Sequence, residues 1–106
     1  MQTPLQISFR GMETSEAVEE RIRERATRLE RFHDRITSCN VVVQAPHRHH
    51  QKGKLYEVHI HLRVPGEEIV VKREGPHGHE DVYVAVRDAF AAMERRLEDF
   101  ARRRSA

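Results

Sequence analysis

Arginine is the residue type in this sequence with the most obvious capacity for binding chemistry. Sixteen of the 19 basic residues are arginine, yet 17 acidic residues leave a net charge of only +2. A guanidinium group is planar and can donate two hydrogen bonds to one phosphate, so clustered arginines favour contacts with a nucleic-acid backbone. Any such surface must come from the way charges are sorted along the chain, because the excess of positive charge is small.

Two helical segments carry most of the candidates for phosphate binding. They are Arg21, Arg25, Arg28, Arg31 and Arg35 in the first segment, and Arg95, Arg96, Arg102 and Arg103 in the second. At about 100° per residue, four of the first five share a sector of about 80° beside the apolar stripe, and Arg25 lies between that sector and the stripe. Nearby acids such as Glu24 leave open an ordinary solvated face with i,i+4 ion pairs.

Histidines form the second group of candidates, as there are eight of them. His59 and His61 are expected to point the same way from one strand, with His47 and His49 in the loop before it. Two imidazoles spaced in this way can share zinc, copper or nickel. Ligand pairs at zinc-finger spacing are missing, however, so these are weak metal candidates beside the alternative of a polar surface. We predict no cofactor.

Several other classes of protein are disfavoured. The sequence has no glycine-rich phosphate loop and no nucleophile motif, so we expect no catalytic residue. Cys39 is the single cysteine, which excludes an internal disulfide, fits a reducing compartment and suggests a small buried side chain. No apolar run approaches the roughly 20 residues needed to cross a bilayer, and no secretion signal is recognisable. We expect a cytoplasmic protein.

The hydrophobic pattern predicts the elements that must position these residues. The expected order is a strand from residue 5, a helix at 15–33, strands at 36–45, 55–64 and 69–74, and a helix from residue 80. This order, β-α-β-β-β-α, predicts a single α+β domain over 1–106, a two-layer sandwich with both helices on one face of a four-stranded antiparallel sheet. The ordered core is expected at about 4–101, with 102–106 a frayed basic tail.

The same pattern predicts which large side chains form the core and which strands lie at the edges. We expect Leu29, Phe32, Tyr83, Phe90 and Leu97 to be core residues rather than stacking surfaces for bases. The second or the fourth strand could pair across an exposed edge, so the oligomeric state is left open.

Three segments together resemble the ribosome hibernation promoting factor family, also called ribosome-associated inhibitor A or sigma-54 modulation proteins. LQISFRGMETSEAVEERIRERATRLERFHDRI resembles its first strand, glycine turn and helix, YEVHIHLRVPGEEIVVKREG its central hairpin, and EDVYVAVRDAFAAMERRL the start of its last helix. The similarity covers residue 5 to about 100. Long members of the family carry a further C-terminal dimerisation domain, and this chain resembles the short form.

The resemblance implies a partner and a mechanism. Family members bind the small ribosomal subunit and its RNA near the decoding centre, and they block messenger and transfer RNA under stress or in stationary phase. Their fold is similar to a double-stranded RNA-binding domain, which contacts RNA shape and phosphates. Arg25, Arg28 and Arg31 match the positions of lysines in the family, and we expect neither DNA nor a membrane as a partner.

The second helix departs from the family, since Ala92, Glu98 and Asp99 stand where basic residues are common. This departure and the histidines motivate a competing hypothesis. In that reading the chain is a diverged interaction module, or a histidine-based metal-binding module, that keeps the fold without binding the ribosome.

Overall fold

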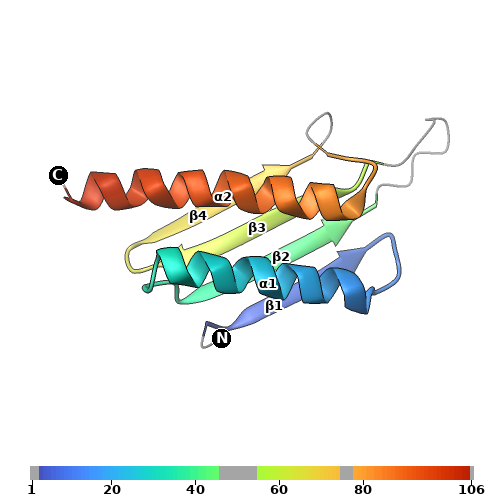
Figure 1. Ribbon diagram of the computed structural model, residues 1–106, viewed down its shortest axis with the longest axis horizontal. Coiled ribbons are helices and arrows are strands. Elements are labelled where there is room, and N and C mark those ends of the chain that lie inside the picture. Colours follow the sequence, from blue (N-terminus) through green and yellow to red (C-terminus); the bar gives the residue numbers. More distant parts are fainter. Residues whose placement is uncertain (1–2, 46–54, 75–77, 106) are drawn as a thin grey trace.

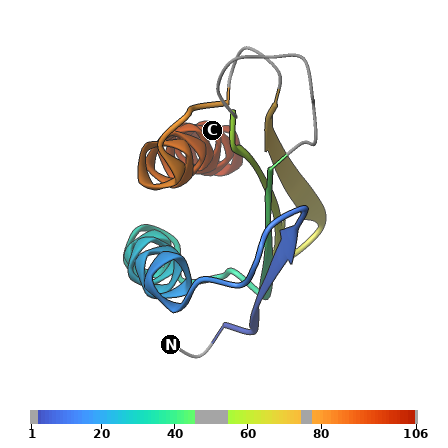
Figure 2. The ribbon, with the colours of Figure 1, turned by 90° about the vertical axis from the view of Figure 1, so that its right-hand side faces the viewer.

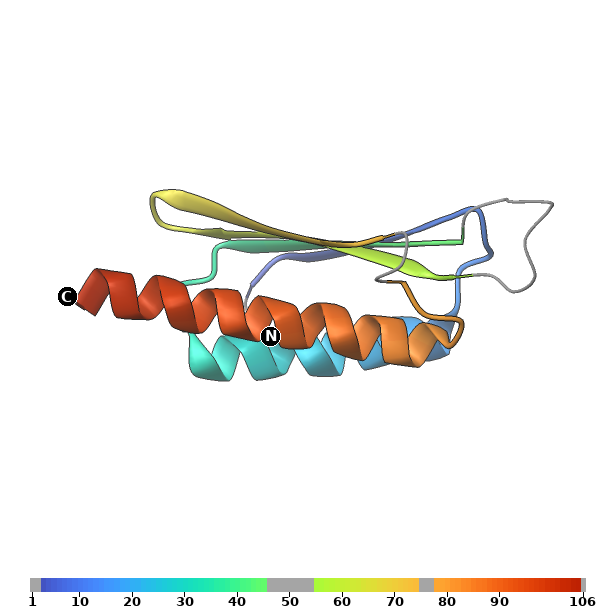
Figure 3. The ribbon, with the colours of Figure 1, turned by 90° about the horizontal axis from the view of Figure 1, so that it is seen from above.

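A computed structural model describes residues 3–45, 55–74 and 78–105 of the chain. The elements are β1 (Leu5–Arg10), α1 (Glu16–Phe32), β2 (Ser38–Gln44), β3 (Glu57–Val64), β4 (Glu67–Arg73) and α2 (Val82–Ser105), as Figure 1 shows. The strands form one sheet in the order β1-β2-β3-β4. Both helices lie on the same side of this sheet (Figures 2 and 3), so the predicted two-layer α+β sandwich is confirmed.

The sheet is mixed, whereas the sequence predicted an antiparallel one. β1 runs parallel to β2, with Ile7 opposite Val41, and the other two pairings are antiparallel. The reason is that α1 separates β1 from β2 and returns the chain to the end of the sheet where β1 began, as a helical crossover does. The edges are therefore β1 and β4. The expectation that β2 could be an exposed edge is wrong, because β1 covers it.

Local chemistry defines the ends of α1. The Ser15 hydroxyl accepts a hydrogen bond from the backbone N–H of Val18 at 3.3 Å, which satisfies one donor of the first turn. Glu16 and Glu19 place negative charge there, where the helix dipole favours it. At the other end, the His33 N–H reaches the Leu29 carbonyl at 3.0 Å, and His33 adopts an extended conformation.

One apolar core fills the space between the two layers. Alternate residues of β2, β3 and β4 face the helices, and Ile22, Leu29, Phe90 and Leu97 meet them from above with at most 3% of their surface exposed. Leu29, Phe90 and Leu97 are thus core residues, as predicted.

Two of the predicted core aromatics are exposed instead. Phe32 is 65% exposed and Tyr83 is 37% exposed. Phe32 is the last residue of α1, and the ring of His33 packs near Phe100 there, with 5.8 Å between ring centroids. Tyr83 lies in the first turn of α2, where Arg21 of α1 covers part of its ring.

The second helix is longer than expected, since it continues through residues that the sequence suggested were a frayed tail. α2 ends at Ser105. An ion pair from Arg102 to Asp99 one turn earlier, and a contact from Arg103 to Glu67, connect this last part to folded neighbours. Among the described residues, no helix is both long enough and apolar enough to cross a membrane.

Candidate RNA-binding surface

Three arginines of α1 form a row on the side of that helix nearest α2. Arg21, Arg25 and Arg28 follow one another at spacings of four and three residues, which places them on one face. We call these three residues the interhelical row. The Arg21 guanidinium carbon lies 5.2 Å from the centre of the Tyr83 ring, and Arg28 Nε lies 3.4 Å from Glu94 Oε1. Both contacts are to α2, so the row borders the junction of the two helices.

The charges of the row are only partly compensated. Arg21 pairs with Glu24 at 3.6 Å and Arg28 pairs with Glu94, and all four side chains are partly or largely exposed. Exposed pairs of this kind contribute little, about 0–1 kcal/mol each, so a phosphate can replace the carboxylate at small cost. Half-buried Arg25 has no ion pair with any described residue.

Arg31 and Arg35 lie close to the C-terminal end of α1. Arg35 lines a shallow hollow of about 360 Å³ together with Phe32, His33, Pro65 and other residues. Arg31 stands in the last turn of α1, where a positive charge is favourable for the helix dipole. Neither arginine forms an ion pair within the described part of the chain. These two residues extend the positive charge of the row toward the tip of the helix.

The candidate arginines of α2 lie elsewhere. Arg96 donates a hydrogen bond to the Val70 carbonyl of β4 at 3.4 Å, and Arg103 lies 3.9 Å from Glu67 at the start of that strand. Arg95 and Arg96 border a second hollow, of about 360 Å³, beside β4. These contacts are on the flank of α2 that faces β4, whereas α1 lies against the other flank.

The structure therefore divides the predicted arginines into two groups. The interhelical row and Arg31 belong to α1, and Arg35 follows the end of that helix. The second group, on or beyond the far flank of α2, is Arg95, Arg96, Arg102 and Arg103. An RNA backbone that contacts both groups has to pass over α2. The sequence placed these arginines on the correct helices except Arg35, which follows the end of α1 at Phe32, and it did not place the two groups relative to one another.

Three residues near the row were not predicted as part of the site. Phe32 and Tyr83 expose aromatic rings beside Arg28 and Arg21, which lie 5.9 and 5.2 Å from the respective ring centres. Glu94 is the acid that α2 contributes to the row. The exposure of the two aromatic rings could have been predicted from the sequence, because each ring lies at the margin of its apolar stripe and at a helix end.

The histidines of β3 have separate acidic partners. His59 Nε2 lies 3.2 Å from Glu74 Oε2, and His61 Nδ1 lies 3.1 Å from Glu68 Oε1. Both imidazoles lie on the sheet face away from the helices, as expected, but each contacts a different carboxylate. The other weak metal candidates, His47 and His49, lie outside the described residues.

Cys39 is buried beneath the helices, with 1% of its surface exposed. Burial raises the pKa of its thiol to about 12, and the negative charge of Glu30 adds to the effect. The reactive thiolate is therefore scarce at neutral pH. This supports the expectation that Cys39 is a small core residue.

Comparison with known sequences decides the family. The profile of the family described as Sigma 54 modulation protein / S30EA ribosomal protein matches residues 5–105. The chain belongs to this family. Two curated members are similar to it: the ribosome hibernation promotion factor of Deinococcus radiodurans, 33% identical over 98 residues, and the ribosome hibernation promoting factor of Azotobacter vinelandii, 34% identical over 80 residues.

The alignments cover a larger fraction of this chain than of its two relatives. The alignments cover 92% and 76% of this S30EA-family chain, but only 49% and 65% of the two relatives. Two solved structures share the fold at low identity. They are a ribosomal subunit interface protein from Coxiella burnetii (TM-score 0.77, 18% identity, 93% of this chain and 98% of that one) and the N-terminal domain of Thermus thermophilus Protein Y (TM-score 0.74, 20% identity, 93% and 99%).

Proposed function

We propose that this protein binds the small ribosomal subunit near its decoding centre and represses translation, by blocking messenger and transfer RNA during stress or in stationary phase. Membership of the S30EA family over residues 5–105 is the observation that carries the proposal. The names of the two curated relatives support it, and the domain that they share with this chain is the one described above. The mechanism is steric and needs no catalytic residue.

The helical layer is the proposed contact surface for ribosomal RNA. It carries Arg25, Arg28 and Arg31, whose guanidinium groups suit phosphate oxygens. Arg21 and Arg35 support them, and Arg95, Arg96, Arg102 and Arg103 contact RNA from the far flank of α2. The face of the sheet away from the helices is less suitable, because three acids, Glu57, Glu68 and Glu74, lie among its basic residues there.

The departures on α2 fit this arrangement. Ala92 is half-buried on the flank near β4, and Asp99 is the partner of Arg102. Glu98 lines a small hollow between the helices together with Phe32 and Glu94. These acids weaken the positive field along α2, so the proposal assigns most of the affinity to α1.

Ribosome sedimentation at several salt concentrations tests the proposal. The triple variant R25E/R28E/R31E is expected to lose co-sedimentation with ribosomes, because it exchanges three phosphate-binding groups for repulsive ones. Binding by the unaltered protein should weaken steeply as salt rises, since each neutralised phosphate releases counterions. The thermal midpoint of the variant should stay close to that of the unaltered protein, because Arg28 and Arg31 are largely exposed.

A matched control changes the same number of charges on the other face of the sheet. R10E/R63E/K72E alters three exposed strand residues and is expected to keep most of the ribosome binding. If this control loses binding and the α1 variant keeps it, the contact surface is the open sheet face. If both variants and the unaltered protein fail to sediment with ribosomes, the proposed function itself is wrong.

A further inference from the structure

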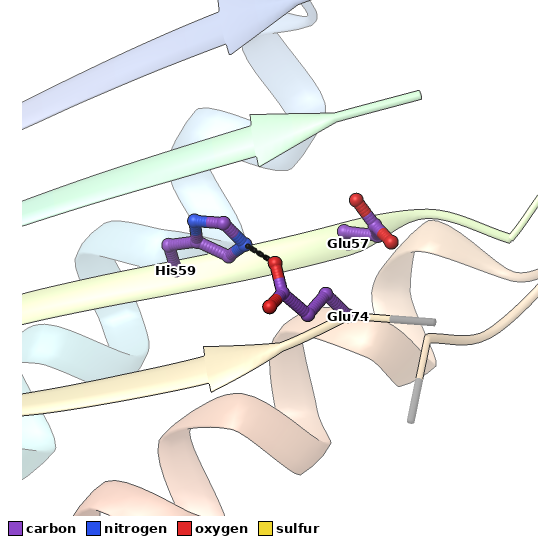
Figure 4. Close-up of side chains that lie close together, drawn as sticks. All are labelled: Glu57, His59 and Glu74. Atoms are coloured by element: carbon purple, nitrogen blue, oxygen red, sulfur yellow. Dashed lines mark ion pairs between the residues drawn. The ribbon is translucent and has the colours of Figure 1, made fainter. Parts of the chain in front are cut away.

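We propose that Glu57, His59 and Glu74 form a zinc-binding site on the face of the sheet opposite the helices. Figure 4 shows the three side chains, with Glu57 and His59 along β3 and Glu74 immediately after β4. One ligand atom from each residue can be chosen so that all three lie within 4.8 Å of one another. The site is separate from the arginines assigned to RNA binding, so it does not depend on the proposed function.

The strand register explains why these residues meet. Glu57 and His59 are two positions apart on β3, so their side chains share a face. His59 is opposite Lys72 and Val58 is opposite Arg73. Continuing this register by one residue puts Glu74 opposite Glu57, on the same face as His59. Two carboxylates directly across a strand pair repel each other, which a bound cation would reverse.

Glu57 has the properties of an oriented metal ligand. Only 7% of its surface is exposed, which is unusual for a glutamate. The side-chain amide of Gln44, the residue opposite it on β2, donates a hydrogen bond to Glu57 Oε1 at 2.6 Å. Outer hydrogen bonds of this kind hold ligating carboxylates in place.

His59 provides an independent indication. Its Nε2 atom is buried, and it lacks a hydrogen bond of acceptable geometry within the described residues, although Glu74 Oε2 is 3.2 Å away. A buried polar atom of this kind needs a partner. A cation held between the imidazole nitrogen and the two carboxylates would supply one.

The ligand chemistry favours zinc over magnesium or calcium. Zinc accepts one imidazole nitrogen and carboxylate oxygens at about 2.0–2.2 Å, which puts tetrahedral ligand atoms about 3.4 Å apart. The distance of 3.2 Å between His59 and Glu74 is close to this value. Magnesium and calcium prefer oxygen ligands throughout. Three protein ligands leave one position for water or for a group from a partner.

His61 offers a matched control on the same face. It lies two residues further along β3 and contacts one carboxylate, Glu68, at 3.1 Å. Arg63 already lies 3.6 Å from Glu68 and supplies a positive charge. His61 therefore has one acidic partner, which Arg63 also contacts, whereas His59 has ligand atoms of two acids within 4.8 Å.

Zinc titration by calorimetry tests the site in the full chain. A background variant, H47Q/H49Q/H50Q/H77Q, first removes the histidines that lie outside the described residues. One zinc per chain is expected to bind to this background protein. Adding His59→Gln or Glu74→Gln should weaken the affinity tenfold or more, and adding His61→Gln should change it less than twofold. The inference is overturned if the background variant no longer binds zinc, or if His61→Gln weakens binding as much as His59→Gln.

A second measurement avoids substitutions in the site altogether. Ring nitrogen resonances of the unaltered protein can be followed by NMR as zinc is added. The Nε2 signal of His59 is expected to shift strongly at one equivalent, with little change at His61. A His59 ring that does not respond to zinc would overturn the inference, and it would leave ribosome sedimentation untouched, so the two proposals fail separately.

Discussion

Replacing Glu94 with glutamine is expected to strengthen ribosome binding, although the substitution adds no contact. Glu94 is the acid of α2 that pairs with Arg28, at 3.4 Å between Oε1 and Nε. RNA must compete with this carboxylate for the guanidinium group, and it also meets the negative charge of Glu94 itself. An amide of the same size removes the charge and keeps the shape.

The expected size of the effect follows from the distance and the exposure. Two unit charges 3.4 Å apart attract by about 1.2 kcal/mol in bulk water. The side chains of Arg28 and Glu94 are 56% and 25% exposed, and pairs of this kind contribute about 0.2–1 kcal/mol in practice. Releasing Arg28 should therefore lower the Kd for ribosomes by roughly 1.4- to fivefold. The free energy of unfolding should fall by less than about 1 kcal/mol.

The assay is a binding titration of labelled protein with purified ribosomes at low and at moderate salt. Glu68→Gln is the matched control, because it removes the same charge from a side chain that pairs with His61 and Arg63 on the open sheet face. The gain in affinity should be confined to Glu94→Gln and should shrink as salt rises. Equal gains from both variants would show that only net charge matters. An unchanged or weaker affinity of folded Glu94→Gln would refute the assignment of Arg28 to RNA.

Three further predictions concern stability and reactivity. In urea denaturation, Phe90→Ala should lower the free energy of unfolding by about 3–5 kcal/mol, because it leaves a cavity in the core. Phe32→Ala should lower it by less than about 1 kcal/mol, because that ring is 65% exposed. Equal losses would contradict the exposed position of Phe32. Burial raises the pKa of the Cys39 thiol from 9.0 to about 12. At pH 8 this thiol should therefore react with iodoacetamide far more slowly in the folded protein than in urea. Between these two pKa values the unfolded chain loses the proton and the folded chain keeps it, so the free energy of unfolding should fall as pH rises from 9 toward 12; a pH titration of thermal unfolding measures this.

Much of the fold could be predicted because the sequence alternates so clearly between two periodicities. The order of elements and the placement of both helices on one face follow from the apolar stripes, such as the one that includes Ile22 and Leu29. The direction of β1 relative to β2 was missed because side-chain alternation is the same in parallel and antiparallel strands. The connecting helix was the available signal, since parallel neighbours need a long crossover.

The candidate site was less predictable, since it depends on contacts between distant segments. A helical projection assigns Arg28 and Arg103 to helix flanks, but it cannot show that Glu94 or Glu67 approaches them. The pairing of His59 with Glu74 likewise requires the register of β3 against β4, which a turn of uncertain length leaves undefined in sequence. Residue types were therefore identified more reliably than their partners.

Arg96 has a consequence for the outer edge of β4. An edge strand presents unpaired backbone groups that can template the addition of another strand and lead to self-association. The guanidinium group of Arg96 donates a hydrogen bond to the Val70 carbonyl, and α2 lies beside the same strand. A second chain that aligned with β4 would first have to displace this side chain. The helix thus blocks one position of edge pairing on β4 while its other flank stays in contact with α1.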